Sequence, residues 1–268
     1  MTAALAEATV DAFLGGRVEA LQPARGHHRA GLDAILLAAA LGPETEGAVF
    51  DLGAGVGVAG MAVAARCART RVTLVEREPE LAALALTALA RPANRAFDDR
   101  VRVVEADLLS AASRAAAGLA DGSADHVVMN PPYYPPAAVR ASPEAGRAGA
   151  HVLAEGGVDA WFRAAAALVA PGGTATAIFR ADGIAELFAA ASGRFGAAIL
   201  LPVHPREGEP ASRLIVRATK GSRGRPALLP GLVLHGEAGS AFLPGPSAVL
   251  REGAALAEIH GAWGRALR

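Results

Sequence analysis

Short apolar runs alternate with longer helix-like stretches along most of this chain. Runs that are apolar throughout are typical of strands buried on both faces, and their alternation with helices is typical of a parallel sheet covered on both sides. The predicted strands span residues 48–52, 72–76, 101–105, 126–129 and 174–179. The predicted helices span residues 58–69, 79–90, 109–119 and 158–170. The pattern therefore predicts an α/β fold with helices on both faces of the sheet.

The alternation changes after residue 179. Residues 197–204 and 213–218 both have strand patterns, and the short connection between them leaves no room for a crossover helix. Two strands joined in this way are typically antiparallel. We therefore expect a seven-stranded, mostly parallel sheet with a C-terminal antiparallel hairpin, followed by a Pro- and Gly-rich stretch over 221–246 and a short final helix.

Length and composition predict one domain. A chain of 268 residues that are 52% hydrophobic can bury a single large core. We expect one domain over residues 1–268, made of an N-terminal extension (1–47), a catalytic core (48–220) and a C-terminal tail (221–268). No apolar run is long enough to cross a bilayer, so we expect no membrane partner.

The cysteine, histidine and charge content argues against a disulfide-stabilised, metal-binding or secreted protein. Cys67 is the single cysteine, which excludes an internal disulfide and a cysteine-based zinc site. The His27-His28 pair has no cysteine or acidic partner nearby, so we expect no metal. Neither a secretory signal nor a net charge is visible, since 26 basic residues balance 26 acidic ones. We expect a cytoplasmic protein.

A glycine-rich segment, Asp51-Leu52-Gly53-Ala54-Gly55-Val56-Gly57, stands where the first predicted strand turns into a helix. Glycines at this turn let a backbone approach a ligand, so Gly53, Gly55 and Gly57 are candidate cofactor-binding residues. The run from Gly55 to Gly60 also fits the G-x-G-x-x-G dinucleotide pattern. Asp51 favours a different ligand, because a carboxylate attracts the cationic amino group of a methionine moiety and repels a pyrophosphate. The loop therefore predicts S-adenosylmethionine.

Two further carboxylates follow the next two predicted strands. Glu76 ends the strand over 72–76, where a carboxylate can accept hydrogen bonds from both ribose hydroxyls. Asp107 follows the strand over 101–105 and can accept from the adenine amino group. The carboxyl ends of neighbouring parallel strands meet at one edge of a sheet, which is where open α/β sheets bind ligands. We therefore predict that Asp51, Glu76 and Asp107 share one cofactor site.

The segment Asn130-Pro131-Pro132-Tyr133 follows the fourth predicted strand. An exocyclic amine or a carboxamide nitrogen has a delocalised lone pair and attacks a methyl group poorly. The Asn130 side-chain oxygen and the Pro131 carbonyl can accept both amine hydrogens and stabilise the positive charge that develops on the nitrogen. Tyr133 offers a flat face on which a flipped base can stack. We therefore predict that Asn130, Pro131 and Tyr133 are the catalytic residues of an N-methyltransferase.

These motifs together resemble class I S-adenosylmethionine-dependent methyltransferases, which have a Rossmann-like fold, and N-P-P-Y is typical of their amino-methylating branch. More narrowly, most of the chain is similar to the bacterial tRNA1(Val) (adenine-37-N6)-methyltransferases of the small-domain group. Segment 32–38 looks like the D-A-x-L-L-A segment that this family places beside the cofactor, and segment 203–206 also matches. The resemblance implies that Asp33 and Asn130 bind the cofactor, and that the partner is tRNA or another structured RNA.

Other functions stay open. The same N-P-P-Y geometry handles the carboxamide of a protein glutamine, although such enzymes usually carry a helical N-terminal domain larger than residues 1–47. A small-molecule acceptor, including one methylated on oxygen, is another alternative. Asp51 and Asn130 argue against a nicotinamide oxidoreductase. The intact set of Asp51, Glu76 and Asn130 argues against a noncatalytic, cofactor-sensing RNA-binding module.

Two weaker features bear on an RNA partner. A basic stretch without acids could follow a phosphate backbone, or it could be an ordinary solvated strand-and-turn face. Its members are Arg213, Arg217, Lys220, Arg223 and Arg225. The Pro-, Ala- and Gly-rich segment 134–159 is either a lid over the acceptor site or a surface loop.

Overall fold

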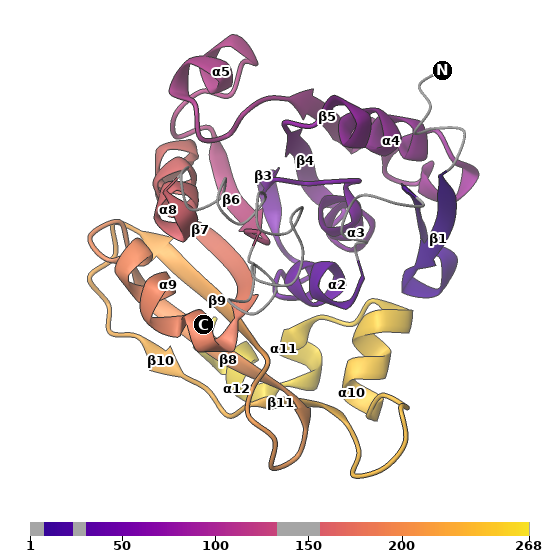
Figure 1. Cartoon of the computed structure of the whole chain (residues 1–268), viewed down its shortest axis with the longest axis vertical. Coiled ribbons are helices and arrows are strands. Elements are labelled where there is room, and N and C mark those ends of the chain that lie inside the picture. Colours follow the sequence, from indigo (N-terminus) through magenta and orange to yellow (C-terminus); the bar gives the residue numbers. More distant parts are fainter. Residues whose placement is uncertain (1–7, 24–30, 133–155, 268) are drawn as a thin grey trace, which may run out of the picture.

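One mixed β-sheet organises the described part of the chain, which covers residues 8–23, 31–132 and 156–267 of the computed structural model (Figure 1). The strands are β3 (Glu46–Leu52), β4 (Arg69–Glu76), β5 (Val101–Glu105), β6 (Ala124–Met129), β7 (Val169–Arg180), β8 (Phe195–Arg206), β9 (Arg213–Lys220), β10 (Ala227–Leu228) and β11 (Leu232–His235). Their order is β10-β8-β9-β7-β6-β3-β4-β5, and β11 also pairs with β8. Only β9 runs antiparallel to its neighbours in this sheet.

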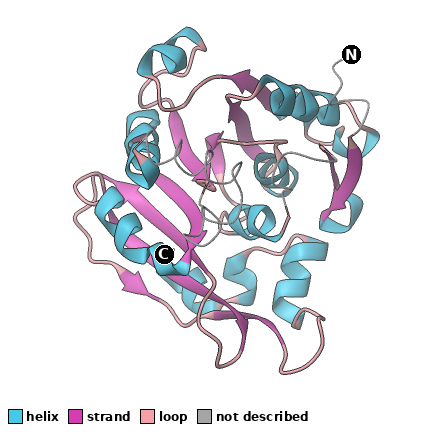
Figure 2. Ribbon diagram, viewed as in Figure 1, coloured by secondary structure: helices cyan, strands magenta, loops and turns pink. Residues whose placement is uncertain are grey.

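Helices cover both faces of the sheet (Figure 2). One face packs against α2 (Leu32–Ala39), α3 (Val58–Arg66), α4 (Pro79–Leu89), α11 (Leu256–Ile259) and α12 (Gly261–Ala266). The other face packs against α8 (Gly157–Leu168) and α9 (Ile184–Ala191). The shorter helices α5 (Ala111–Ala116) and α10 (Pro244–Ser247) and a separate hairpin of β1 (Thr9–Phe13) and β2 (Val18–Gln22) complete the described elements. Each face therefore has its own apolar core.

The α/β fold expected from the sequence is confirmed. All seven predicted strands are present. Strand β5 matches its predicted ends, and every other strand end lies within five residues of its predicted position. The predicted hairpin is the antiparallel pair of β8 and β9. Helix α4 begins at Pro79, since the missing N–H of proline costs nothing in a first turn.

The structure differs from the expectation in the N-terminal extension, in the C-terminal tail and at two helices of the core. The C-terminal tail is not only loop, because β10 and β11 run parallel to β8 and extend the sheet, with Leu232 and Leu234 buried. The helix expected over 109–119 is shorter, because the Ser110 side chain caps it by accepting from the Ser113 N–H, and Gly118 with φ 71° follows its end. Helix α9 was not predicted, and neither were α2 and the hairpin of β1 and β2 in the N-terminal extension.

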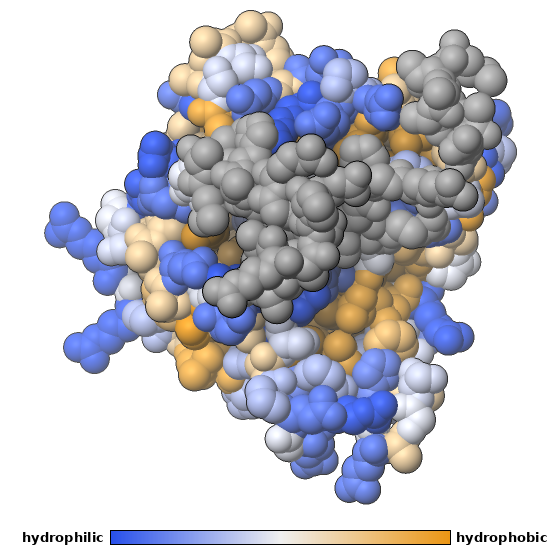
Figure 3. All heavy atoms as spheres, in the orientation of Figure 1, coloured by the Kyte–Doolittle hydropathy of each residue, from blue (hydrophilic) through white to orange (hydrophobic). Residues whose placement is uncertain are grey.

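The N-terminal hairpin and the part of the C-terminal segment around Leu250 lie together beside α2. A surface hollow there is lined by apolar side chains from the N-terminal hairpin, α2 and the C-terminal segment, and apolar residues gather in that region of Figure 3. Its larger lining side chains are Phe13, Leu32, Ile35, Phe242 and Leu250. Among the described helices, none has the length and apolar character needed to cross a bilayer.

Candidate active site

The carboxyl ends of β3, β4, β5 and β6 lie side by side at one edge of the sheet. Leu52, the last residue of β3, pairs with the ends of both β4 and β6, and β4 pairs with β5. The glycine loop after β3, Glu76, Asp107 and Asn130 are therefore brought to one edge, as the sequence predicted. Edges of this kind are where open α/β sheets bind ligands.

Two hydrogen bonds hold the glycine loop to β4, and the loop borders open space at Gly55. The N–H groups of Gly53 and Ala54 both donate to the Val75 carbonyl oxygen, at 2.9 and 3.0 Å. Gly53, Gly55 and Gly57 have φ values of 67°, 57° and 84°, a backbone region that favours glycine. A Cβ built on Gly55 would have no described heavy atom within 4 Å. Gly55 therefore borders open space at the sheet edge.

Asp51 lies beneath this loop and faces α3. Its exposed fraction is 3%, and its Oδ2 accepts a hydrogen bond from the Gly60 N–H at 2.8 Å. A Cβ on Gly60 would stand 2.2 Å from Leu74 Cδ2, so only glycine allows this close approach. Burial raises the pKa of Asp51 from 3.8 to about 7, and nearby Glu76 adds to the rise, while the Gly60 hydrogen bond opposes it. The predicted strand-end acid thus also fastens α3 to β3, a role the sequence did not indicate.

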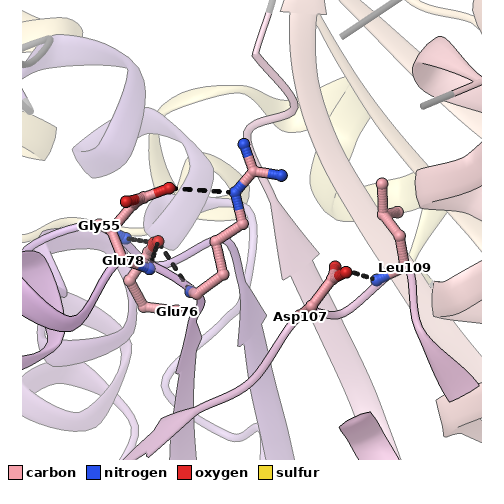
Figure 4. Close-up of polar contacts among 6 residues, drawn as sticks. Gly55, Glu76, Glu78, Asp107 and Leu109 are labelled. Carbon is pink, nitrogen blue, oxygen red and sulfur yellow. Dashed lines mark hydrogen bonds and ion pairs between the residues drawn. The ribbon is translucent and has the colours of Figure 1, made fainter. Parts of the chain in front are cut away.

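Glu76 binds the backbone of two loops (Figure 4). Its Oε2 accepts from the Gly55 N–H at 2.7 Å, and its Oε1 accepts from the N–H groups of Arg77 and Glu78, both at 2.9 Å. An ionised carboxylate offers about four lone-pair positions, and three of these are filled. Glu76 therefore orders the glycine loop. Only one lone-pair position is left, so the two predicted hydrogen bonds from the ribose hydroxyls require Glu76 to release one of its backbone hydrogen bonds.

Asp107 follows β5 and keeps one oxygen available. Its Oδ1 accepts from the Leu109 N–H at 2.9 Å (Figure 4). Its own N–H donates to Ser113 Oγ at 3.0 Å. Within the described ranges its second carboxylate oxygen accepts no hydrogen bond. That oxygen can accept from a donor such as an adenine amino group.

Asn130 presents a buried acceptor directly after β6. Its Oδ1 has no hydrogen-bond partner among the residues that the structure describes. An unpaired buried polar atom costs about 1–3 kcal/mol, so each one needs an explanation, and a ligand that supplies the missing donor is one. Pro131 is buried and Pro132 is exposed. Tyr133 and residues 134–155 lie outside the described residues, so the stacking role and the lid stay predictions.

Asp33 lies in the first turn of α2 and pairs with Arg213. The distance from Arg213 Nε to Asp33 Oδ2 is 2.8 Å, and the Asp33 side chain is 15% exposed. Arg213 pairs across the strands with Arg180, the last residue of β7, so the ion pair lies at the same edge of the sheet as the other site residues. The contact of Asp33 with the cofactor stays a prediction.

The basic stretch from Arg213 to Arg225 does not form one exposed strip. Arg213 binds Asp33, Lys220 Nζ donates to the Val169 carbonyl oxygen at 2.6 Å, and burial lowers the pKa of Arg217. Arg213, Arg217 and Lys220 also lie along the whole length of β9, from its first residue to its last. Their positions favour the alternative of an ordinary strand-and-turn face.

One side chain at the site was missed from the sequence. Trp161 in α8 lies against Gly53, where a Cβ would stand 2.3 Å from its Cη2 atom. A single tryptophan within an alanine-rich helix carries no recognisable signal of this contact. No group of three metal-binding side chains occurs within the described ranges, and Cys67 is buried with its Sγ 3.2 Å from the Gly42 carbonyl oxygen.

Comparisons with known proteins agree with this geometry. The family model described as the methyltransferase small domain matches residues 27–165. The chain is 38% identical to a solved Agrobacterium tumefaciens protein described as a predicted O-methyltransferase, with a TM-score of 0.71 over 83% of this chain and 97% of that one. It shares its fold with Pyrococcus horikoshii TYW2 in complex with MeSAdo, at 11% identity and a TM-score of 0.52 over 81% and 72% of the two chains. No curated protein matches the sequence.

Proposed function

The chain belongs to the methyltransferase small-domain family of S-adenosylmethionine-dependent methyltransferases, and on this premise we propose that its acceptor is an exocyclic amino nitrogen, N6 of adenine in tRNA. The enzyme class and the cofactor follow from the family. The choice of methyl acceptor rests on the side chains of the candidate site.

The residues at the sheet edge fit the cofactor. S-adenosylmethionine supplies a methyl group on a sulfonium centre, and its transfer needs little beyond an in-line arrangement of donor and acceptor. Gly55 borders open space, and Asp107 keeps one carboxylate oxygen for the adenine amino group. An ammonium group next to the buried Asp51 carboxylate would favour its ionised form.

The unpaired Oδ1 of Asn130 is the observation that carries the proposal. A buried acceptor with no donor among the described residues matches an amine that brings its own hydrogens. A nitrogen that takes the methyl group from the sulfonium would become pyramidal and positive, which would strengthen its hydrogen bond to Oδ1, and it would then release one proton to water to give the neutral methylated amine. Asn130 therefore stabilises the transition state more than the ground state, which is the condition for catalysis.

Adenine suits this arrangement because its amino group has two hydrogens for two acceptors, Asn130 Oδ1 and the Pro131 carbonyl oxygen. A base reaches such a site only after it leaves its stack, and Tyr133 would then offer a stacking face. The resemblance of segment 32–38 and of N-P-P-Y to tRNA adenine methyltransferases supports RNA as the carrier of that base.

The test uses the purified protein, methyl-labelled S-adenosylmethionine and total tRNA from a strain without the gene. We expect label in tRNA, and mass spectrometry of the digested nucleosides should identify N6-methyladenosine. Nuclease treatment before the reaction should abolish incorporation. Label in protein or in small molecules, with tRNA unlabelled, would contradict the proposal.

A second candidate is O-methylation of a small molecule. The observation in its favour is the Agrobacterium tumefaciens protein, which is 38% identical and described as a predicted O-methyltransferase. A hydroxyl acceptor must lose its proton, and an asparagine amide cannot take it. This candidate therefore predicts nuclease-resistant label in a methyl ether, and it predicts that Asn130 is dispensable.

A further inference from the structure

We propose that Trp161 is a positioning residue for methyl transfer, because it holds the glycine loop in place from within the apolar cluster that also contains the residue before Asn130. The proposal depends on the methyl-donor site and holds whichever acceptor the enzyme uses. Trp161 lies in the first half of α8, on the face of the sheet opposite to α3.

Gly53 stands between two supports. On one side, its N–H donates to the Val75 carbonyl oxygen at 2.9 Å. On the other side, the indole of Trp161 fills the space that a side chain would need, since a Cβ on Gly53 would lie 2.3 Å from Cη2 and 2.9 Å from Cζ3. The loop is therefore held between β4 and α8, without room to move toward either.

Trp161 also packs into the apolar cluster beneath the neighbouring strand ends. Its exposed fraction is 9%, and the cluster includes Leu52, Leu108 and Met129. These three residues are the direct chain neighbours of the glycine loop, the carboxylate after β5 and the acceptor amide after β6. Trp161 thus contacts the glycine loop directly and shares one apolar cluster with the residue next to Asn130, and its helix α8 packs against β6.

The indole suits this task because it is large and rigid, with only two rotatable bonds. A smaller side chain leaves a cavity into which the loop and α8 can shift. Misplacement of reacting groups by about 1 Å can cost about 100-fold in rate, even when the change lies away from the chemistry. A positioning role should therefore alter kinetic constants of the folded enzyme, which a purely structural role would not do.

The chain offers a matched control. Trp263 is the only other tryptophan; it is 0% exposed and belongs to the core on the opposite face of the sheet. At a temperature where both variants are folded, Trp161→Leu should lower kcat/KM for S-adenosylmethionine by about 10- to 100-fold. Trp161→Phe should fall between this variant and the native enzyme. Trp263→Leu should lower Tm and keep the native kcat/KM, and equal kcat/KM values for the two leucine variants would overturn the proposal.

A second measurement needs no acceptor and no activity, so it stands even if the acceptor is not adenine. In the Trp263→Phe protein, Trp161 is the only tryptophan that fluoresces. Titration with S-adenosylhomocysteine should change the emission of Trp161, with the same Kd that calorimetry gives. Unchanged emission at saturating ligand would show that the loop and the indole are not coupled, and this result decides the matter if Trp161→Leu does not fold.

Discussion

At the scale of single residues, the acceptor and donor functions of the site rest on different atoms. Asn130 Oδ1 is a buried hydrogen-bond acceptor without a partner among the described residues, and it is proposed to contact the methyl acceptor. Glu76 accepts a hydrogen bond from the Gly55 N–H and so holds the glycine loop, the proposed site of the methyl donor. Asn130→Ala should therefore lower kcat by about 100- to 1000-fold, the usual loss when one preorganised polar group at a developing charge is removed. The Kd of S-adenosylhomocysteine, measured by calorimetry, should change little. Asn130→Asp keeps an acceptor oxygen and should retain more activity, and a near-native kcat for Asn130→Ala would exclude the amino-nitrogen mechanism.

Asp51 makes the stability of the cofactor-free protein depend on pH. Its pKa is raised from 3.8 to about 7, so the unfolded chain ionises first as pH rises. The folded state favours the protonated Asp51 carboxyl. Its contribution to the free energy of unfolding is therefore fully present below pH 3.8, falls as pH rises from 3.8 to about 7, and does not change further above that. The loss is of the order of 4 kcal/mol, since one pKa unit corresponds to about 1.4 kcal/mol. Urea unfolding from pH 4.5 to 8 should show this slope in the native protein and lack it in Asp51→Asn.

Cofactor binding should have the opposite pH dependence. The cationic amino group of the cofactor favours ionised Asp51, so the affinity for S-adenosylhomocysteine should weaken as pH falls below about 7, and binding there should release a proton. Calorimetry in two buffers of different ionisation enthalpy measures that proton. Binding that is independent of pH in the native protein would mean that Asp51 acts only as the anchor of α3.

The placement of the candidate site residues at one edge of the sheet was predictable, but their mutual contacts were not. Asp51, Glu76 and Asn130 follow strand patterns, and parallel strands must bring their carboxyl ends to one edge. The hydrogen bonds from Gly60 to Asp51 and from Gly55 to Glu76 depend on how closely α3 and the loop approach the sheet. Such distances are set by tertiary packing, and a linear pattern does not contain them.

At the scale of elements, Arg66 joins three segments that lie far apart in the sequence. From α3, its Nη1 donates to the carbonyl oxygens of Ala38 and Leu41 at 2.6 and 3.1 Å, and its Nε donates to that of Gly253 at 2.7 Å. Ala38 lies in the last turn of α2 and Leu41 follows its end, and the Ala38 carbonyl also accepts from the Leu41 N–H at 3.2 Å. One guanidinium thus fixes α2, α3 and the C-terminal segment together.

Arg66→Met should therefore lower the free energy of unfolding by about 3 kcal/mol, because it leaves three carbonyls without their charged donor. Arg69→Met is the matched control. Arg69 pairs with Glu46 on the surface, where the two side chains are 61% and 69% exposed, and such pairs contribute less than about 1 kcal/mol. Urea unfolding measures both, and equal losses would show that Arg66 does not join these segments.

Elements were predictable where a strand-length run is apolar throughout and unpredictable where alanine and glycine blur the pattern. Strands β3 to β9 stood out because sheets covered on both faces need apolar runs. Helix α9 has only eight residues, four of them alanine, and it leaves the apolar side chains of Ile184 and Phe188 exposed, so the sequence does not separate an apolar face from a polar one. Strands β10 and β11 have two and four residues among prolines and glycines, which is too short for an alternation to show.

At the scale of the whole molecule, the tail beyond the predicted catalytic core completes the fold. Strands β10 and β11 cover the outer edge of β8, and an uncovered edge exposes unpaired backbone groups. Val249, Leu256 and Trp263 are each 0% exposed and share one core with α2 and α3. The boundary expected at residue 220 is therefore a change in composition and not a structural border within the described ranges.

A chain that ends at Lys220 tests this conclusion. It loses the strands that cover β8 and the side chains that fill one of the two cores, and a buried tryptophan alone contributes about 3–5 kcal/mol. Because domains of this size are stable by only about 5–15 kcal/mol, the shortened chain should not unfold cooperatively and should aggregate on expression. Circular dichroism during thermal unfolding measures this, with Trp263→Phe as the control that keeps most of the buried volume and should remain cooperative. A shortened chain that melts in one sharp transition and binds S-adenosylhomocysteine with the native Kd would show that residues 1–220 form the complete domain, and that the C-terminal segment only lies on its surface.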